Sequence, residues 1–205
     1  TFRMYTEMLA EGMVPEAKRP EYIASLHREA ERLHHLVENV LFYARIERRR
    51  AVKNVEEVPL TAFLDHLEGG LRERAERAGM QLLLDTVPAE VTVRIDQSAA
   101  ERVVVNLVDN ACKYAGDAED NRIHVTCEQA DRSVAVSVRD HGPGVDRRRL
   151  RRLFRPFSKS SREAAGSPAG VGLGLALSRR LARRLGTPIS MERSSTAIAC
   201  AHCRC

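Results

Sequence analysis

Three segments of the chain place amide, carboxylate and glycine residues at spacings that suit a binding site. The first carries Asn106 and Asn110, followed by Lys113 and Tyr114. Residues four apart lie on one face of a helix, and an amide oxygen is a neutral ligand for a Mg²⁺ ion that keeps several waters. An isolated pair of this kind is more often structural, but together with the glycine segments described below it favours a metal and phosphate site, with Lys113 meeting phosphate and Tyr114 flanking the sugar and base. The alternative for Asn106 is a buried amide that ties the helix to a neighbouring loop.

The second segment, Asp140-His-Gly142-Pro-Gly144, begins where an apolar strand ends. A carboxylate held there can accept a hydrogen bond from an exocyclic amine. Adenine and guanine both carry such an amine, so Asp140 alone does not choose between them. Gly142 and Gly144 allow close backbone approach and positive φ. The same pattern also occurs in ordinary turns, so its meaning comes from the segments around it.

The third segment contains Gly170, Gly172, Leu173 and Gly174, directly before a helix. Backbone N–H groups at the start of a helix form an anion site. The segment lacks the Gly-Lys-Ser/Thr end of a Walker loop and the strand order of a dinucleotide fingerprint. Together, the three segments predict a pocket for a nucleoside triphosphate and its metal ion.

Two aromatic residues, Phe154 and Phe157, precede the third segment within a basic stretch. They suit the anchors of a mobile lid, from which Lys159 or Arg162 would reach phosphate. The alternative is that both phenylalanines belong to an ordinary hydrophobic core.

Composition limits the class of protein. The chain has 205 residues, of which 43% are hydrophobic and 30% charged, which allows one sizeable soluble domain and a smaller one. No apolar run reaches the roughly 18 residues of a membrane helix. Thr1 is not a natural start, so we expect a piece of a longer chain, whose membrane anchoring stays open.

The net charge of +5 comes largely from the arginines in 147–152 and 179–184. We interpret these arginines as solvated helix faces rather than a nucleic-acid site, because no aromatic residues accompany them.

The five cysteines indicate no disulfide framework. Cys112 and Cys127 lie inside regular segments and resemble small buried hydrophobes, which fits a reducing compartment. The other three, Cys200, Cys203 and Cys205, surround His202. Their spacing matches no zinc pattern, so we expect a disordered tail rather than a metal site.

Residues 1–50 predict two helices. The first covers about 1–12 and the second begins near Pro20, a residue that suits a first helical turn. Apolar residues of the second helix alternate three and four apart, as in a coiled coil: Ile23, Leu26, Ala30, Leu33, Val37, Val40 and Ala44. A hairpin with such a stripe is expected to pair with a second copy into a four-helix bundle. The alternative is that the stripe packs on the rest of this chain.

Residues 51–56 read as a linker, and from 57 the chain alternates between strand and helix patterns. Strands are expected at 58–60, 80–87, 91–95, 122–129, 133–139 and 188–193. Helices are expected at 61–78, after a cap at Asp96 or Ser98, and at 172–185. A short basic helix is expected to follow Pro143. The alternation predicts a mixed sheet covered on one side by helices.

At this point the chain resembles a sensor histidine kinase of two-component signalling. Its second part is similar to the ATPase fold that these kinases share with DNA gyrase, mismatch-repair ATPases and a heat-shock chaperone. Four family boxes stand in order: the N box at 106–114, the G1 box at 140–144, the F box at 154–157 and the G2 box at 170–174. The resemblance implies an α+β protein, in which a helical hairpin, half of a dimeric four-helix bundle, precedes an α/β sandwich that spans 57–205.

The resemblance also implies roles for the residues of these boxes. Carried over by position, Asn110 is the Mg²⁺ ligand and Asn106 supports it. Lys113 meets phosphate, Tyr114 lies near the nucleotide and Asp140 recognises the adenine amine. The implied ligand is Mg-ATP. The implied partners are a second copy, joined through 1–50, and the receiver domain of a response regulator, with no nucleic acid and no membrane contact by this segment. We expect a cytoplasmic location.

Three features depart from the family pattern. The phosphoacceptor motif, His-Glu/Asp-x-x-x-Pro, does not occur, and His27, His34 and His35 lack its flanking residues, so this piece is expected not to phosphorylate itself. Hydrolytic relatives place Glu where Asn106 stands, which favours phosphotransfer over hydrolysis. Residues 197–205 match a final apolar strand poorly, so completion of the sheet there is in doubt.

The leading hypothesis is therefore the ATP-binding core of a histidine kinase, which transfers the γ-phosphoryl of ATP to a histidine and onward to a response-regulator aspartate. Two alternatives stay open: an inactive nucleotide-binding dimeric scaffold and an ATP hydrolase of the gyrase type.

Overall fold

The computed structural model describes most of the chain, which divides into two compact units, Thr1–Leu41 and Phe42–Cys205. The described residues are 2–47, 54–85, 91–116, 118–130, 133–145, 152–156, 173–186, 189–191, 195–201 and 203–204.

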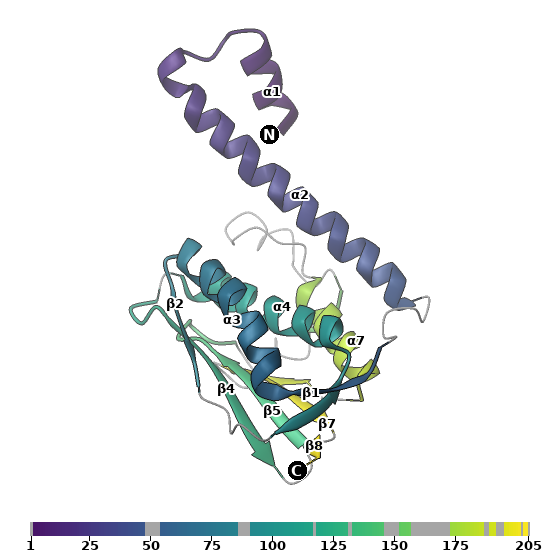
Figure 1. The fold of residues 1–205 in the computed structure, drawn as a ribbon. Helices are drawn as coiled ribbons and strands as arrows, with labels where there is room; N and C mark the ends of the chain where they lie inside the picture. The colour runs from purple at the N-terminus through teal and green to yellow at the C-terminus, as the bar shows by residue number, and fades with distance from the viewer. Residues whose placement is uncertain are drawn as a thin grey trace. The chain divides into compact units, whose positions relative to one another are not determined.

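The first unit is built from two helices joined by a turn, as predicted (Figure 1). Helix α1 covers Phe2–Ala10, a short 3₁₀ helix follows at Glu16–Lys18, and α2 covers Arg19–Glu47. Gly12, with a φ of 69°, ends α1, because glycine tolerates the left-handed region. The rings of Tyr5 and Tyr22, whose centroids are 4.8 Å apart, pack α1 on α2. Several apolar side chains of the stripe are exposed, including those of Ile23, Leu33 and Val37.

The second unit is an α/β sandwich, which confirms the predicted fold class. Three helices cover one face of a five-stranded sheet: α3 (Leu60–Arg77), α4 (Gln97–Ala115) and α7 (Gly174–Arg184) (Figure 1). The sheet has the order β2-β4-β5-β7-β6, and only β2 and β4 run parallel among these pairs. Its strands are β2 (Gln81–Leu84), β4 (Arg122–Ala130), β5 (Ser133–Arg139), β6 (Ile189–Met191) and β7 (Ser195–Ala201).

A second sheet, with the order β1-β3-β8, completes the sandwich. Its strands are β1 (Glu56–Pro59), β3 (Thr92–Ile95) and β8 (Cys203–Arg204), all antiparallel. The predicted strand at 58–60 ends earlier, because Pro59 precedes the first turn of α3 and Leu60 already belongs to that helix.

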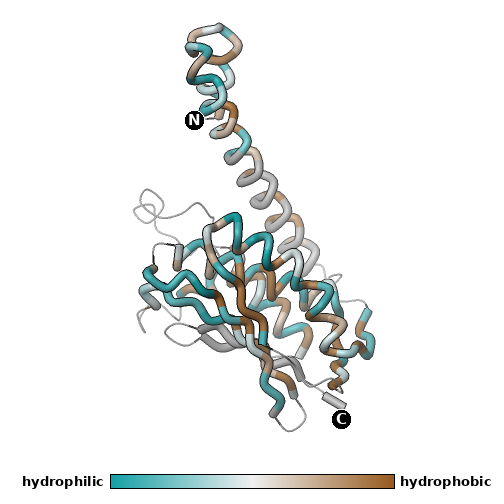
Figure 2. Tube along the Cα trace, turned by 60° about the vertical axis from the view of Figure 1, so that its left-hand side comes forward, coloured by the Kyte–Doolittle hydropathy of each residue, from teal (hydrophilic) through white to brown (hydrophobic). Residues whose placement is uncertain are grey.

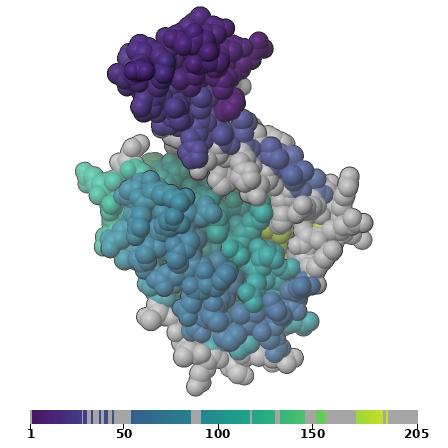
Figure 3. All heavy atoms as spheres, turned by 45° about the horizontal axis from the view of Figure 1, so that its top comes forward, coloured from purple at the N-terminus to yellow at the C-terminus, as the bar shows by residue number. Residues whose placement is uncertain are grey.

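The core lies between the helices and the sheet, where hydrophobic residues recur along both layers (Figure 2). On β5, burial alternates as expected for a strand with one covered face, and the buried side chains are Val134, Val136 and Val138. Helix α4 contributes a stripe at helical spacing, made of Val103, Val104, Leu107, Val108 and Ala111. In the space-filling view, α3 and α4 lie side by side on one face (Figure 3).

The sequence-based expectation for the tail was wrong. Instead of a disordered tail, residues 195–201 form β7, which pairs with β5 along its whole length and with β6. Cys203 then pairs with Val93 in the second sheet. His202 and Cys205 lie outside the described residues. Backbone pairing on both sides stabilises β7, although alanine and cysteine favour strands little by themselves.

Candidate nucleotide site

Helix α4 carries the amides of the candidate site and is fixed at its start. Asp96 caps the helix, as expected, by accepting a hydrogen bond from the Ala99 backbone N–H at 3.0 Å. The Ser98 hydroxyl, the alternative cap, instead donates to Asp96 Oδ1 at 3.1 Å. With its apolar stripe buried, α4 presents Asn106 and Asn110 half-buried on another face.

The two amides lie together, as their spacing predicts. Asn110 Nδ2 donates to the backbone oxygen of Asn106 at 2.7 Å, which leaves the oxygen of the Asn110 amide as the end that can bind a cation. Asn106 Nδ2 is buried and finds no acceptor among the described residues. A buried amide without a partner is costly to the free protein. Among the described residues, Asn106 Nδ2 therefore has capacity for a further hydrogen bond.

Gly174 brings the start of α7 against these amides. A Cβ at this position would lie 3.6 Å from Asn106 Oδ1 and 3.7 Å from Asn110 Nδ2, which is ordinary van der Waals contact. Leu173, the residue that precedes α7, is buried and makes no side-chain cap hydrogen bond. Helix starts leave their first N–H groups for acceptors outside the helix and favour anions.

The turn after β5 lies against the other end of the same stretch of α4. A Cβ on Gly142 would come within 3.1 Å of the Tyr114 backbone oxygen and 3.2 Å of the Ala115 Cβ. That is tighter than most Cβ contacts, so a side chain here would force the turn or α4 to shift. Gly144 has a φ of 70° and requires glycine. The N box and the G1 box are thus adjacent in space.

Asp140 is half-buried at this turn, and Gly142 N–H donates to its Oδ1 at 2.9 Å. Burial raises the pKa of the Asp140 carboxyl, while the Gly142 hydrogen bond and the nearby His141 act in the opposite direction. Oδ2 accepts no hydrogen bond from the described residues, so the carboxylate keeps one oxygen for a donor from a ligand.

Lys113 and Tyr114 lie in the last turn of α4. The Lys113 ammonium lies 5.6 Å from the centre of the Tyr114 ring, within cation–π range. Tyr114 is 43% exposed.

Of the residues predicted to form or anchor the lid, the structure describes only Phe154. Phe154 lies in the described segment 152–156, where its ring is 5.2 Å from the Arg179 guanidinium of α7. Phe157, Lys159, Arg162, Gly170 and Gly172 lie outside the described residues.

His141 was not among the predicted site residues, although it lies between Asp140 and Gly142, which were. Its Nε2 lies 3.6 Å from Asp120 Oδ2, and its ring is 5.4 Å from that of His124, at 64°. The only sequence signal was its place in the second segment, because both partners are distant along the chain.

Neither a conventional metal cluster nor a membrane helix occurs in the part of the chain that the structure describes. No group of three or more His, Cys, Asp and Glu side chains there can hold a metal ion. Among the same residues, every helix is too short or too polar to cross a membrane.

Comparison with known proteins identifies the family of the chain. The family described as histidine kinase-, DNA gyrase B- and HSP90-like ATPase matches residues 95–202, and the His kinase A phosphoacceptor domain matches residues 1–49. The sensor protein SrrB of Staphylococcus aureus strain MRSA252 is 28% identical over 156 residues, which cover 76% of this chain and 26% of that protein. The chain therefore spans about a quarter of the length of the curated relatives that it matches.

Solved structures share the fold. The Acinetobacter baumannii histidine kinase AdeS matches with a TM-score of 0.76 and 21% identity, over 98% of this chain and 93% of that one. Full-length ShkA in complex with AMPPNP matches with a TM-score of 0.68 and 23% identity, over 97% of this chain and 42% of that one. Because the first of these family models matches more than half of the chain, the chain belongs to the histidine kinase-, DNA gyrase B- and HSP90-like ATPase family, and the second model and the SrrB relatives identify it as a sensor histidine kinase.

Proposed function

We propose that residues 57–205 bind Mg-ATP and serve as the catalytic core of the kinase, which transfers the γ-phosphoryl to a histidine and onward to a response-regulator aspartate. One observation carries the proposal. Gly142 and Gly174, 32 positions apart by their numbers, both lie against α4 in the stretch from Asn106 to Ala115. The contacts gather a carboxylate, two amides and a helix start on one surface.

Each group has a chemical role in this proposal. The free Asp140 oxygen accepts a hydrogen bond from the adenine amine, and the exposed Tyr114 ring flanks the base. Lys113 and the uncapped start of α7 neutralise phosphate charge. Phe154 and Phe157 anchor the lid, with Lys159, Gly170 and Gly172 close to the phosphates.

The donor set also fits a magnesium ion. Asn110 would be the ligand, with its amide oriented by the Asn106 backbone oxygen, and the unpartnered Asn106 amide would meet a ligand group. One neutral oxygen suits an ion that keeps its waters and is held mainly by phosphates. When bound, the ion would neutralise charge on the transferred phosphoryl group.

The protein's own part is positioning and charge neutralisation. Asn106 stands where hydrolytic relatives have a glutamate, so no general base for water is supplied at that position. This favours transfer to a histidine over rapid hydrolysis.

The first 50 residues have the complementary role in this proposal. The exposed stripe of α2 would pair with a second copy, and the response regulator would dock on the resulting bundle. His27, His34 and His35 lack the acceptor motif, so the acceptor histidine of this proposal is not among these three residues. In this proposal the helical hairpin covers 1–50, the linker 51–56 and the ATP-binding domain 57–205. The proposed location is the cytoplasm, where ATP is available.

The decisive experiment is Asn110→Ala with calorimetric titration of Mg-ATP. We expect affinity to fall at least about tenfold, as for loss of a group that holds a metal, with an unchanged circular dichroism spectrum. Asn121→Ala is the matched control, because its amide only bonds the Gly79 backbone oxygen. Equal affinity in the two variants would overturn the magnesium role.

The alternatives separate in two further assays. Radiolabelled ATP and a bundle with an intact acceptor histidine should give phosphotransfer in trans. Nucleotide binding without transfer would favour the scaffold, and rapid steady-state phosphate release would favour the hydrolase.

A further inference from the structure

A cluster beside Asp140 is not used by the proposed nucleotide site. It contains His141 from the turn, His124 from β4 and Asp120 from the loop before β4. Because His141 follows Asp140 directly, whatever holds the imidazole also limits where the carboxylate can point.

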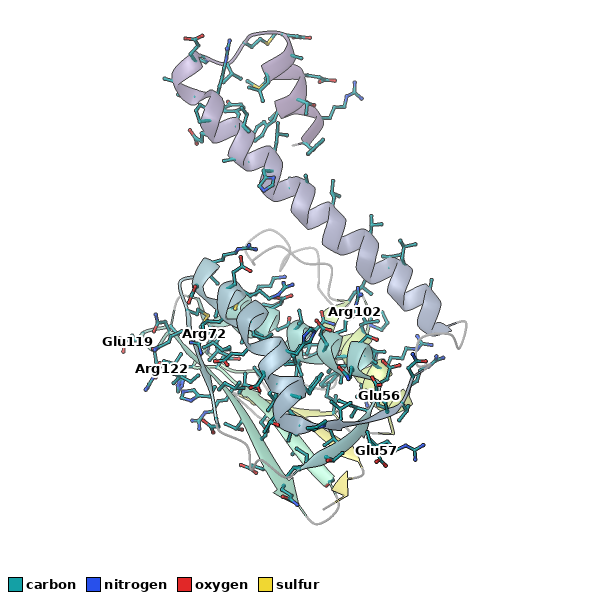
Figure 4. The ribbon with its side chains drawn as sticks, viewed as in Figure 1. Glu56, Glu57, Arg72, Arg102, Glu119 and Arg122 are labelled. Carbon is teal, nitrogen blue, oxygen red and sulfur yellow. The ribbon has the colours of Figure 1, made fainter. Side chains whose placement is uncertain are left out.

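Asp120 is a fixed acceptor in this cluster. Arg122 donates to Oδ1 from Nε at 2.8 Å and to Oδ2 from Nη2 at 2.6 Å, and its backbone N–H donates to Oδ1 at 3.1 Å. These hydrogen bonds hold the pKa of the Asp120 carboxyl well below its usual range. Arg122 begins β4, next to Glu119 in Figure 4. Asp120 therefore presents an oriented negative charge toward His141.

His141 has unused hydrogen-bonding capacity directed at that charge. Its Nε2 is buried and makes no hydrogen bond with the described residues. At 3.6 Å, the separation from Asp120 Oδ2 is within ion-pair range and slightly too long for a hydrogen bond. A small movement of the turn closes it, and the hydrogen can come from either the imidazolium or the neutral Nε2–H tautomer.

The other groups around His141 leave Asp120 as its electrostatic partner. The His124 ring meets it edge to face, and Asp140 belongs to the same turn. From α4, the turn meets the Tyr114 backbone oxygen and the Ala115 methyl group, at Gly142. Arg122 at the start of β4 thus holds Asp120, and Asp120 in turn faces His141 in the turn that carries Asp140.

We propose that His141 is a positioning residue for purine selection: its contact with Asp120 fixes the 140–144 turn so that the free oxygen of Asp140 faces the exocyclic amine of adenine. The proposal rests on the proposed function, in which Asp140 reads the base. A guanine in the same pose places its carbonyl oxygen where adenine has the amine, opposite an acceptor. Selectivity then depends on how rigidly Asp140 is held.

The test measures dissociation constants for Mg-ADP and Mg-GDP by calorimetry and compares their ratio among variants. His141→Asn should lower the preference for ADP about three- to tenfold, the equivalent of one hydrogen bond. Asp120→Asn should do the same, and the double variant should go no further. Asp120→Glu, which keeps the carboxylate, should retain most of the preference. His66→Asn, an exposed histidine on α3, is the matched control.

A merely structural role predicts a different pattern. Loss of stability alone lowers the active fraction and leaves the ratio of the two constants unchanged. Intact nucleotide binding with an unchanged ratio in both His141→Asn and Asp120→Asn overturns this inference alone, as does additivity in the double variant. A natural chain that binds neither nucleotide overturns the proposed function as well. Asp120→Asn alters a partly exposed pair, so it supplies the answer if His141→Asn does not fold.

Discussion

The two ends of α4 both contain polar groups in sheltered positions, but only one end satisfies them. At the start, Asp96 is 4% exposed and accepts hydrogen bonds from Ser98 Oγ, from Ala99 N and, at 3.4 Å, from Asn54 N. Farther along α4, Asn106 Nδ2 is buried and has no hydrogen-bond partner among the described residues. Burial also raises the pKa of Asp140, in the turn that packs on Tyr114 and Ala115 at the end of the helix. A satisfied buried group stabilises a fold. An unsatisfied one costs stability until another group completes it, as expected for the proposed ligand site.

Asp96→Ala tests whether the start of α4 serves the fold alone, and it has the largest expected effect on stability. The substitution leaves the first N–H groups of α4 and the Asn54 N–H without an acceptor. We expect a loss of about 2 kcal/mol in the free energy of unfolding, measured by urea titration. Nucleotide affinity of the folded fraction should stay within about twofold, since Asp96 lies more than two helical turns from Asn106. A stable variant that binds nucleotide poorly would reverse the assignment of the two ends.

Gly142→Ala tests the contact that joins the G1 turn to α4. The added methyl group would meet the Tyr114 oxygen at 3.1 Å and Asp140 Oδ1 at 3.0 Å, so the turn must move and carry Asp140 with it. We expect ADP affinity to fall about tenfold and stability to fall by about 1 kcal/mol, from calorimetry and thermal melting. Gly70→Ala is the matched control, because nothing lies within 4 Å of its Cβ. It should stabilise α3 by about 0.5–1 kcal/mol.

The sequence predicted α4 and its residues well, because the relevant signals are local. A capping aspartate, a helical stripe and two amides four residues apart all lie within 20 positions, and each has a direct physical reason. The G1 turn was predicted for the same reason, since Gly142 and Gly144 are required by backbone sterics. The prediction that the three segments meet in one pocket came from their order and spacing, and the family resemblance supported it.

Two features could not be predicted from local patterns. Strand β7 consists mostly of serine, threonine, alanine and cysteine, and its stability comes from pairing with β5 and β6. Such pairing depends on partners that are distant along the chain. The contact between His141 and Asp120 spans 21 positions and depends on how β4 and the G1 turn meet. In both cases, tertiary context decides what the residue does.

Asp140→Asn has the smallest expected effect on stability, and its sign separates the two ends of α4 most directly. The raised pKa means that the folded protein holds the charged form less readily than the unfolded chain does. The charged carboxylate therefore destabilises the fold above its folded pKa, and this cost vanishes below about 3.8, where both states are protonated. Asp140→Asn should thus melt slightly higher than the natural chain at pH 7, and the difference should disappear as pH falls toward 3.

The same substitution should reduce the preference for ADP over GDP. A carboxylate only accepts hydrogen bonds, whereas the asparagine amide can also donate one to the carbonyl oxygen of guanine. A gain in stability together with a loss of selectivity is the behaviour of a group held in place for a ligand. Asp96→Asn, made in parallel, should lose stability at pH 7, because its carboxylate serves the fold. If Asp140→Asn also melted lower than the natural chain at pH 7, Asp140 would be a structural residue like Asp96, and the contrast between the two ends would fail.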